Sequence, residues 1–387
     1  MTVASVLDTP AKFSSNCPPL LHVEAGALHV TRADARPLVL HPTWLRERLP
    51  DPRVIDPLTG QRLMEAAELP ADLSILSISP EGRLCFSDGF ETHLPPDWLA
   101  RVMPPRPVTQ PVLWDGSLSL PEPVAFAAMC TPAQAGETGN PALAAFLDRL
   151  ATYGFAVVGG VPTDMDGALE FARLIGPIRI TNWGGLADVR AIAQAYDLTM
   201  TPRHLEPHSD NPYREPVPGH ILLHCLANDA TGGESTLVDG FHAAAMLRAT
   251  NPQAFDILTR TEVLFRYHDA TTLLESRAPL IALDGAGEVK QVRYSNRTEY
   301  IDALPPQILD RYYVARQAFW DLIRPDSALT LRFKLGPGEL LMMDNYRLFH
   351  GRTGYRLETG SRHMRQCYMD RDTVASRRDT LCHAPNP

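Results

Sequence analysis

Three potential metal ligands constrain what this chain can fold into. His208 and Asp210 are separated by one residue, and His350 follows the carboxylate by 140 residues. In an extended segment, residues two apart point to the same side, so the first pair can bind one ion. The third ligand joins them only in a fold that returns a late strand beside an early one. A double-stranded β-helix, or jelly roll, has this property.

Two imidazoles and one carboxylate form the facial triad that holds non-heme Fe(II) and leaves coordination positions open. The His-x-Asp pair alone is a weak signal in a chain with 13 histidines. Later residues strengthen it, because Ser235 and Thr236 offer hydroxyls and Arg362 follows His350 by 12 residues. A guanidinium binds a carboxylate through two charge-assisted hydrogen bonds. Metal ligands, hydroxyl and arginine together suit 2-oxoglutarate as a co-substrate.

The same residues are also compatible with two other classes of protein. A zinc-dependent hydrolase uses ligands of the same kind, although it would not need the hydroxyl and the following arginine. A jelly-roll cavity can also bind a ligand without turnover. The presence of all three metal ligands argues against a binding protein that has lost its catalytic activity.

Nine segments carry a resemblance to one known family. In the C-terminal two thirds they are residues 208–214, 222–225, 232–235, 238–241, 345–352 and 361–363, and nearer the N-terminus they are residues 44–46, 56–62 and 96–99. These segments resemble the γ-butyrobetaine hydroxylase-like branch of the taurine dioxygenase-like Fe(II)/2-oxoglutarate-dependent oxygenases. The resemblance covers nearly the full length of the chain.

The resemblance implies a dioxygenase with Fe(II), 2-oxoglutarate and O2, which hydroxylates a small zwitterionic amine or trimethylammonium acid and releases succinate and CO2. It places the distal carboxylate of 2-oxoglutarate on Arg362 and a hydroxyl contact on Ser235, with Thr236 as the alternative. His224 is a further candidate for this contact, and a position in the core explains it equally well. Arg352 is expected to brace the metal site from behind. The family also implies a homodimer.

The substrate is expected to resemble γ-butyrobetaine or trimethylaminoethylphosphonate. Aromatic rings bind a quaternary ammonium group through their quadrupoles, and the candidate rings are Trp183, Tyr213 and Tyr368. Three other family aromatic positions correspond here to Ala187, Met200 and Asn211. The cage is therefore thinner, and a less methylated amino acid or aminophosphonate remains the alternative substrate.

The acidic group of the substrate needs hydrogen-bond donors. The candidates are Asn211, Tyr213, Asn296 and Arg297. A guanidinium beside an amide suits a carboxylate or a phosphonate. For an amine with fewer methyl groups, Asp197 or Glu206 could replace the aromatic contact with an ion pair.

Charge and composition exclude several classes of partner. The net charge of −9 argues against nucleic acid or an anionic membrane as the main partner. There is no apolar run of about 18 residues, which a membrane span requires, and the N-terminus does not read as a signal peptide. The six cysteines are scattered without a C-x-x-C pair, which favours a reducing cytoplasmic compartment.

The chain is predicted to be α+β, mainly β, with two domains. Residues 1–102 predict a small β-rich domain, with strands at 21–23, 27–30, 38–40, 74–78 and 83–86. Some family members hold a structural zinc there through cysteines after the Trp-Leu-Arg motif, but residues 47–52 contain no Cys, so we expect no such zinc. Residues 103–112 predict a Pro-rich, semi-rigid linker. Residues 113–387 predict the jelly-roll domain with helical inserts.

The larger domain is expected to begin with a helix over 140–152, because Asn140 suits the N-cap and Pro141 the first helical position. A strand at 153–158 and a helix at 165–174 follow. Further helices are expected within 240–258 and over 305–326. The strands expected to complete the roll are residues 263–265, 280–283, 289–294, 330–334 and 339–343.

Overall fold

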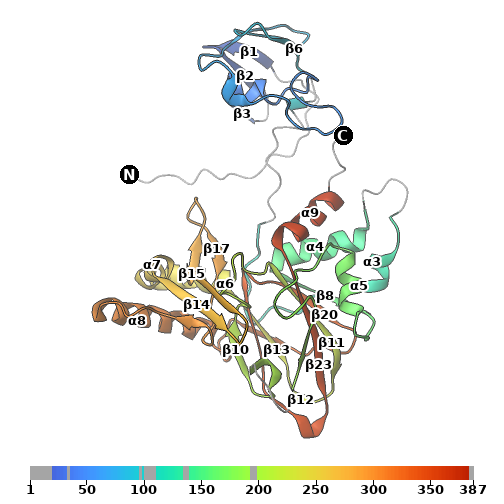
Figure 1. The fold of residues 1–387 in the computed structure, drawn as a ribbon, viewed down its shortest axis with the longest axis vertical. Coiled ribbons are helices and arrows are strands. Elements are labelled where there is room, and N and C mark those ends of the chain that lie inside the picture. The colour runs from blue at the N-terminus through green and yellow to red at the C-terminus, as the bar shows by residue number, and fades with distance from the viewer. Residues whose placement is uncertain are drawn as a thin grey trace. The chain divides into compact units, whose positions relative to one another are not determined.

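The computed structural model describes residues 20–32, 35–95, 98–99, 110–133, 139–191 and 198–382. The chain divides into two compact units, residues 1–108 and 109–387 (Figure 1). The division falls inside the segment predicted to be the linker. Residues 103–109 of that segment, and the N-terminal residues tested for a signal peptide, lie outside the described ranges.

The N-terminal unit consists of two small antiparallel sheets. One has the order β1-β2-β3 and the other β4-β5-β6. The strands are β1 (Leu20–Glu24), β2 (Ala27–Arg32), β3 (Ala35–Leu40), β4 (Ile75–Ile78), β5 (Arg83–Phe86) and β6 (Glu91–His93), with the short helices α1 (Pro42–Arg46) and η1 (Ala66–Glu68). Alternate residues such as Leu28 and Val30 face a core that also contains Phe86 and Trp98. The first five strands lie where the alternating pattern placed them.

The second unit is built around two larger sheets, of six strands in the order β7-β8-β20-β11-β23-β9 and of four in the order β10-β21-β13-β19. Their strands are β7 (Val124–Ala125), β8 (Phe155–Gly159), β9 (Ala187–Arg190), β10 (Leu205–His208), β11 (His220–Asn228), β13 (Ser235–Asp239), β19 (Thr330–Phe333), β20 (Leu340–Asp344), β21 (Leu348–Arg352) and β23 (Arg362–Met369). A buried cluster takes Ile221 and Leu341 from the first sheet and Leu237 and Leu348 from the second. The two sheets therefore share one core.

Helices cover the other face of the six-stranded sheet. They are α3 (Phe126–Cys130), α4 (Pro141–Tyr153), α5 (Gly167–Arg173) and α9 (Arg371–Cys382). As expected, Asn140 caps α4, and its side chain accepts a hydrogen bond from the backbone N–H of Leu143. Gly154, with a φ of 79°, ends the helix in the left-handed conformation that favours glycine. Leu222 and Cys367 pack against these helices from the sheet.

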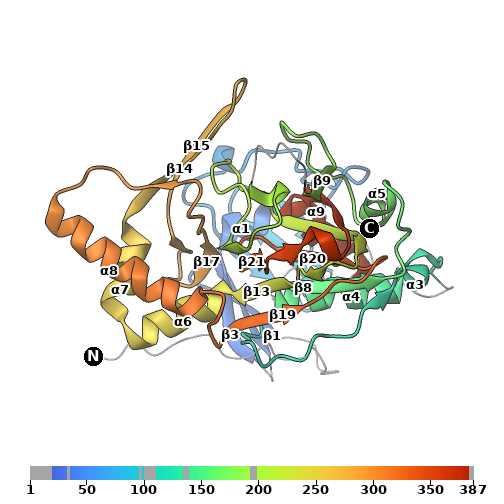
Figure 2. The same ribbon diagram turned by 90° about the horizontal axis from the view of Figure 1, so that it is seen from below.

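A separate subdomain packs on the opposite side of the second unit, as both views show (Figures 1 and 2). It contains α6 (Gly240–Thr250), α7 (Pro252–Arg260), α8 (Pro306–Ile323), β14 (Glu262–His268), β15 (Leu273–Pro279), β16 (Ile281–Leu283), β17 (Val289–Val292) and β18 (Glu299–Tyr300). The predicted insert over 240–258 is thus two helices, because Asn251 ends α6 and caps α7 ahead of Pro252. The core around Phe265, Tyr294 and Phe319 joins this subdomain to Phe349 of β21 in the four-stranded sheet.

The sequence-based assignment of three strands to the roll was wrong. Residues 263–265, 280–283 and 289–294 coincide with β14, β16 and β17, which form the separate sheets β15-β14-β18 and β16-β17. An alternating apolar pattern identifies a strand but not the sheet that it joins. Of the five strands expected to complete the roll, the last two, which became β19 and β20, belong to the large sheets, as does the strand predicted at 153–158, which became β8.

The remaining short elements are β12 (Thr231–Gly232), which pairs with β22 (Tyr355–Arg356), and the 3-10 turns η2 (Leu198–Met200) and η3 (Leu357–Thr359). The second unit is therefore a mixed architecture in which strands dominate. Within the described ranges, no helix is both long and apolar enough to cross a lipid bilayer.

Candidate metal centre and active site

The register between β10 and β21 places two histidines side by side. His208 and His350 are direct partners across these antiparallel strands, and their ring centroids lie 4.3 Å apart. Asp210 follows β10, and its Oδ1 lies 3.4 Å from Nε2 of His208 and 3.7 Å from Nε2 of His350. The structure thus brings the three predicted ligands together, with their ligand atoms within 4.8 Å of one another.

The protonation of these side chains suits a divalent cation. Nδ1 of His208 lies 2.8 Å from the carbonyl oxygen of Glu206, so it carries the proton and leaves a lone pair on Nε2. That Nε2 is buried and has no hydrogen-bond partner among the described residues. Burial, with the neighbouring His208, lowers the pKa of His350 to about 3. Burial alone would raise the pKa of Asp210, but the two histidines lower it overall. The donor set fits Fe(II).

The carboxylate of Asp210 is oriented by two donors from β23. Its Oδ2 accepts hydrogen bonds from Nε2 of Gln366 at 2.7 Å and from the hydroxyl of Tyr368 at 2.8 Å. Burial and the adjacent carboxylate raise the pKa of Tyr368 well above its usual value, so the phenol remains a donor. Asn345 fixes the backbone of Asp210, accepting from its N–H at 2.8 Å and donating to its carbonyl at 2.9 Å. Oδ1 is left to face the histidines.

Positively charged side chains line the cavity. Arg352 and Arg362 are both buried and line it, together with Arg297 and Ser235. Burial, with the nearby Arg352, lowers the pKa of Arg362 to about 10, so the guanidinium stays charged at neutral pH. In the part of the chain that the structure describes, no carboxylate forms an ion pair with either Arg352 or Arg362. A buried cation without a counter-ion is costly, and the anionic 2-oxoglutarate would supply one.

The candidate residues for binding 2-oxoglutarate differ in whether their side chains reach the cavity. Ser235 faces the cavity, whereas Thr236 points to the opposite side of β13 and is absent from the lining. His224 is fully buried, and its ring lies against Gly167 of α5. The structure therefore does not bring His224 to the cavity. Arg352 donates hydrogen bonds to the carbonyl oxygens of Thr201 and Arg203 at 2.6 and 2.8 Å. These bonds hold the loop that precedes β10 against β21, the strand that contains His350.

Three aromatic rings lie together in the same cavity, whose volume is about 660 Å³. Tyr213 and Tyr267 are stacked with centroids 5.3 Å apart, and Trp183 meets Tyr267 edge-on at 5.1 Å. The guanidinium of Arg214 lies over the Trp183 ring, 5.5 Å from its centroid. Tyr368 also lines this cavity, although its hydroxyl is bound to Asp210.

The predicted donors for an acidic group are only partly brought together. Arg297 and Asn211 line the cavity, whereas Asn296 is not among the lining residues. Asn211 has a φ of 50°, a conformation that Asn tolerates better than most residues, and its Oδ1 accepts from the hydroxyl of Tyr213 at 2.6 Å.

Sequence reasoning missed three residues of this site. Gln366 and Tyr267 carry no local signal, because their positions depend on the pairing of strands far apart in the chain. Asn345 lies in one of the segments that carry the family resemblance, so a signal existed, but nothing local indicated that it would bind the backbone at residue 210. Their roles follow only from the three-dimensional arrangement.

Comparison with known proteins extends these observations. A protein named gamma-butyrobetaine dioxygenase from Pseudomonas sp. (strain AK-1) is 35% identical over 366 residues, which cover 91% of this chain and 93% of that protein. A mitochondrial trimethyllysine dioxygenase from Rattus norvegicus is 29% identical, with coverage of 86% and 80%. The crystal structure of a taurine dioxygenase from Burkholderia xenovorans aligns with a TM-score of 0.46 and 17% identity, over 61% of this chain and 82% of that one.

Residues 131–368 match the family described as "Taurine catabolism dioxygenase TauD, TfdA family". The matched range is more than half of the chain and contains His208, Asp210, His350 and Arg362. It favours an oxygenase over the zinc-dependent hydrolase and the non-catalytic binding protein that the metal ligands alone left open. The chain belongs to the TauD, TfdA family and is a dioxygenase that uses Fe(II) and 2-oxoglutarate.

Proposed function

We propose that this dioxygenase hydroxylates a small trimethylammonium acid of the γ-butyrobetaine type and releases succinate and CO2. The observation that carries the proposal is the cluster of Trp183, Tyr213 and Tyr267 in the cavity that also contains the metal ligands. Aromatic rings bind a quaternary ammonium group through their π-faces, and all three rings line this cavity. The names of the relatives, gamma-butyrobetaine dioxygenase and trimethyllysine dioxygenase, support a substrate of this class.

Different residues would bind the metal, bind 2-oxoglutarate and orient the aspartate ligand. His208, Asp210 and His350 would hold Fe(II), which with 2-oxoglutarate and O2 supplies the oxidising power for the hydroxylation of a C–H bond. Arg362 and Ser235 would bind the distal carboxylate of 2-oxoglutarate. Gln366 and Tyr368 would hold the carboxylate of Asp210 in one orientation.

The substrate would lie between the rings and the metal ligands. Arg297 and Asn211 are the proposed donors to its acidic group, because both line the cavity. Asn296 remains a proposed contact that requires a rearrangement, since it lies outside the lining. A less methylated amino acid or aminophosphonate is the second candidate, favoured by Ala187 and Met200, two small or flexible side chains in the lining at positions where an aromatic ring was expected.

The proposal also covers the type of fold, the oligomeric state and the cellular compartment. The four-stranded and six-stranded sheets, which share one core, would be the two halves of a double-stranded β-helix. The family resemblance supports a homodimer. The unpaired Cys85, Cys130, Cys225 and Cys367 support a reducing, cytoplasmic environment.

Two measurements test the proposal. An anaerobic titration with Fe(II) and 2-oxoglutarate should produce a weak visible charge-transfer band that His208→Ala abolishes. Succinate formation should then be stimulated by γ-butyrobetaine, trimethyllysine or trimethylaminoethylphosphonate more than by their less methylated analogues. The reverse preference would establish the second candidate, and no stimulation by any of them would overturn the proposed substrate class.

A further inference from the structure

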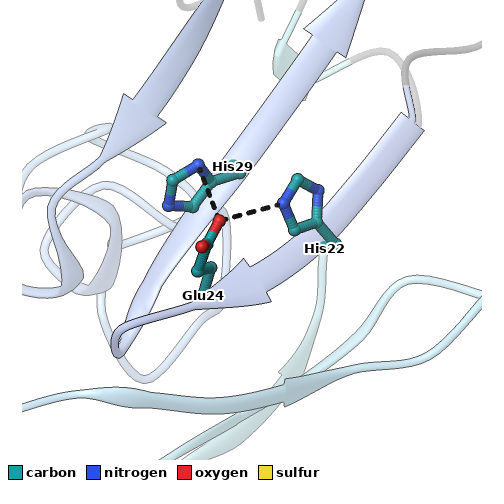
Figure 3. A group of neighbouring side chains, drawn as sticks. All are labelled: His22, Glu24 and His29. Atoms are coloured by element: carbon teal, nitrogen blue, oxygen red, sulfur yellow. Dashed lines mark ion pairs between the residues drawn. The ribbon is translucent and has the colours of Figure 1, made fainter.

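A second group of metal-ligating side chains lies on the hairpin of β1 and β2 in the N-terminal unit. His22 and His29 are direct partners across these antiparallel strands. Glu24 lies two residues after His22, so its side chain projects from the same face of the hairpin. Figure 3 shows its carboxylate between the two imidazole rings.

The hairpin holds these three side chains outward for a structural reason. Its opposite face carries Leu28 and Val30, which are buried in the core of the N-terminal unit. The connecting turn is Ala25-Gly26, with φ of 49° and 78°, and the positive values suit the tight turn of a two-residue hairpin. The carbonyl of Gly26 accepts a hydrogen bond of 2.8 Å from the N–H of Ile75 in β4. The turn is therefore anchored to the second sheet.

The separations between the ligand atoms fit a metal ion better than a direct contact. Oε2 of Glu24 lies 3.6 Å from Nε2 of His22 and 4.0 Å from Nδ1 of His29. Both distances exceed the ordinary hydrogen-bond range of about 2.7–3.2 Å. Ligands bound at about 2.0–2.1 Å to a tetrahedral ion are separated by roughly 3.4 Å. Small side-chain rotations would therefore place all three atoms, which lie within 4.8 Å of one another, around one ion.

The chemistry of the ligands indicates the kind of ion. We propose that His22, Glu24 and His29 form a second metal site, which binds a divalent transition ion such as Zn²⁺ with water completing the coordination. Two imidazole nitrogens and one carboxylate oxygen are common zinc ligands. The side chains are 47%, 69% and 24% exposed, so the ion can enter from solvent. The affinity series from Fe²⁺ toward Cu²⁺ and Zn²⁺ favours the later ions over iron here.

This site differs from the zinc site whose absence was expected. That expectation concerned a site built from cysteines after the Trp-Leu-Arg motif, where residues 47–52 contain no Cys. The hairpin offers a different ligand set on other strands. An ion bound there would join β1 to β2, and because a ligand that binds only the folded state stabilises it, the N-terminal unit would gain stability from Zn²⁺.

Equilibrium dialysis of the full-length, metal-free protein with Zn²⁺ tests the site. The active-site triad can also take Zn²⁺, so the comparison is made in a His208→Ala background. We expect this variant to retain one Zn²⁺ per chain, and the addition of His22→Ala and His29→Ala to remove it. His93→Ala, an exposed histidine on β6 of the same unit, is the matched control and should retain the ion. An unchanged stoichiometry after the double substitution would overturn the proposal.

A milder variant separates ligand loss from misfolding. Glu24→Gln keeps the size of an exposed side chain but removes the anionic ligand, and should weaken Zn²⁺ binding at least about tenfold. With EDTA, the thermal unfolding of Glu24→Gln should match that of the wild type. In the His208→Ala background, added Zn²⁺ should raise the unfolding temperature of the chain that keeps Glu24 and not that of the chain that also carries Glu24→Gln. An equal rise in both of these proteins would contradict the site. With His208 intact, Glu24→Gln alone should leave turnover with Fe(II) and 2-oxoglutarate unchanged.

Discussion

Asp210 differs from the other two metal ligands in how it is held. One carboxylate oxygen faces His208 and His350, while the other accepts hydrogen bonds from Gln366 and Tyr368. Both donors come from β23, a strand of the other sheet. The geometry of the metal site therefore depends on how the two sheets pack, and not on the ligand strands alone.

Removing either donor should weaken iron binding. We predict that Gln366→Ala and Tyr368→Phe each raise the dissociation constant for Fe(II) about 10–100-fold, the usual effect of losing a group that orients a metal ligand. Anaerobic titration followed by the charge-transfer band measures this constant. Tyr346→Phe is the control, since the Tyr346 hydroxyl contacts the carbonyl of Val217 and not Asp210. Equal Fe(II) affinity in the wild type and the three variants would show that the hydrogen bonds to Oδ2 of Asp210 do not contribute to iron binding.

Arg362 should determine the affinity for 2-oxoglutarate. Arg362→Lys keeps the charge but loses the forked pair of donors, so we predict a rise of tenfold or more in the KM for 2-oxoglutarate with a smaller change in kcat. Arg365→Lys is the control, because Arg365 pairs with Asp188 at 3.0 Å. Initial rates at varied 2-oxoglutarate decide the matter, and similar KM values for the two variants would reject the assignment.

At the scale of elements, local signals predicted some features and could not predict others. The ends of α4 were predictable because Asn140 and Pro141 act within one turn of the helix. The convergence of residues 208, 210 and 350 was predictable because metal chemistry demands it. The sheet to which β14 belongs, and the arrival of Gln366 at Asp210, depend on strand order, which side-chain alternation does not encode.

The cap of α4 supports a prediction about stability. The Asn140 side chain accepts from Leu143 N–H at 2.8 Å and donates to the carbonyls of Ala128 and Thr131 at 2.8 and 2.7 Å. Asn140→Ala should lower the free energy of unfolding by about 1–2 kcal/mol. Asn140→Asp keeps the acceptor and loses the donors, so urea denaturation should place it between wild type and Asn140→Ala. An Asp variant as unstable as the Ala variant would mean that the donors dominate.

For the whole molecule, one buried histidine links stability to pH. His220 lies in β11, where its register partners are Asp344 of β20 and Met369 of β23. Burial lowers the pKa of His220 from 6.5 to about 4, and the attraction of Asp344 offsets this only in part. The unfolded chain therefore binds a proton at a higher pH than the folded protein does. The part of the stability that depends on a neutral His220 is therefore fully present above pH 6.5 and is lost as the pH falls toward 4.

The size of this loss can be predicted and measured. A pKa difference of about 2.5 corresponds to about 3 kcal/mol at most, so the free energy of unfolding of the metal-free protein should fall by up to that amount between pH 7 and pH 4. Replacing the titrating group, as in His220→Gln, should reduce the slope of the profile over this interval even if it lowers stability at pH 7, and the buried His350, whose pKa is also lowered, accounts for a further part of the slope. His93→Gln, at an exposed position, should leave the slope unchanged. If His220→Gln kept the wild-type slope, the acid sensitivity would belong to other groups.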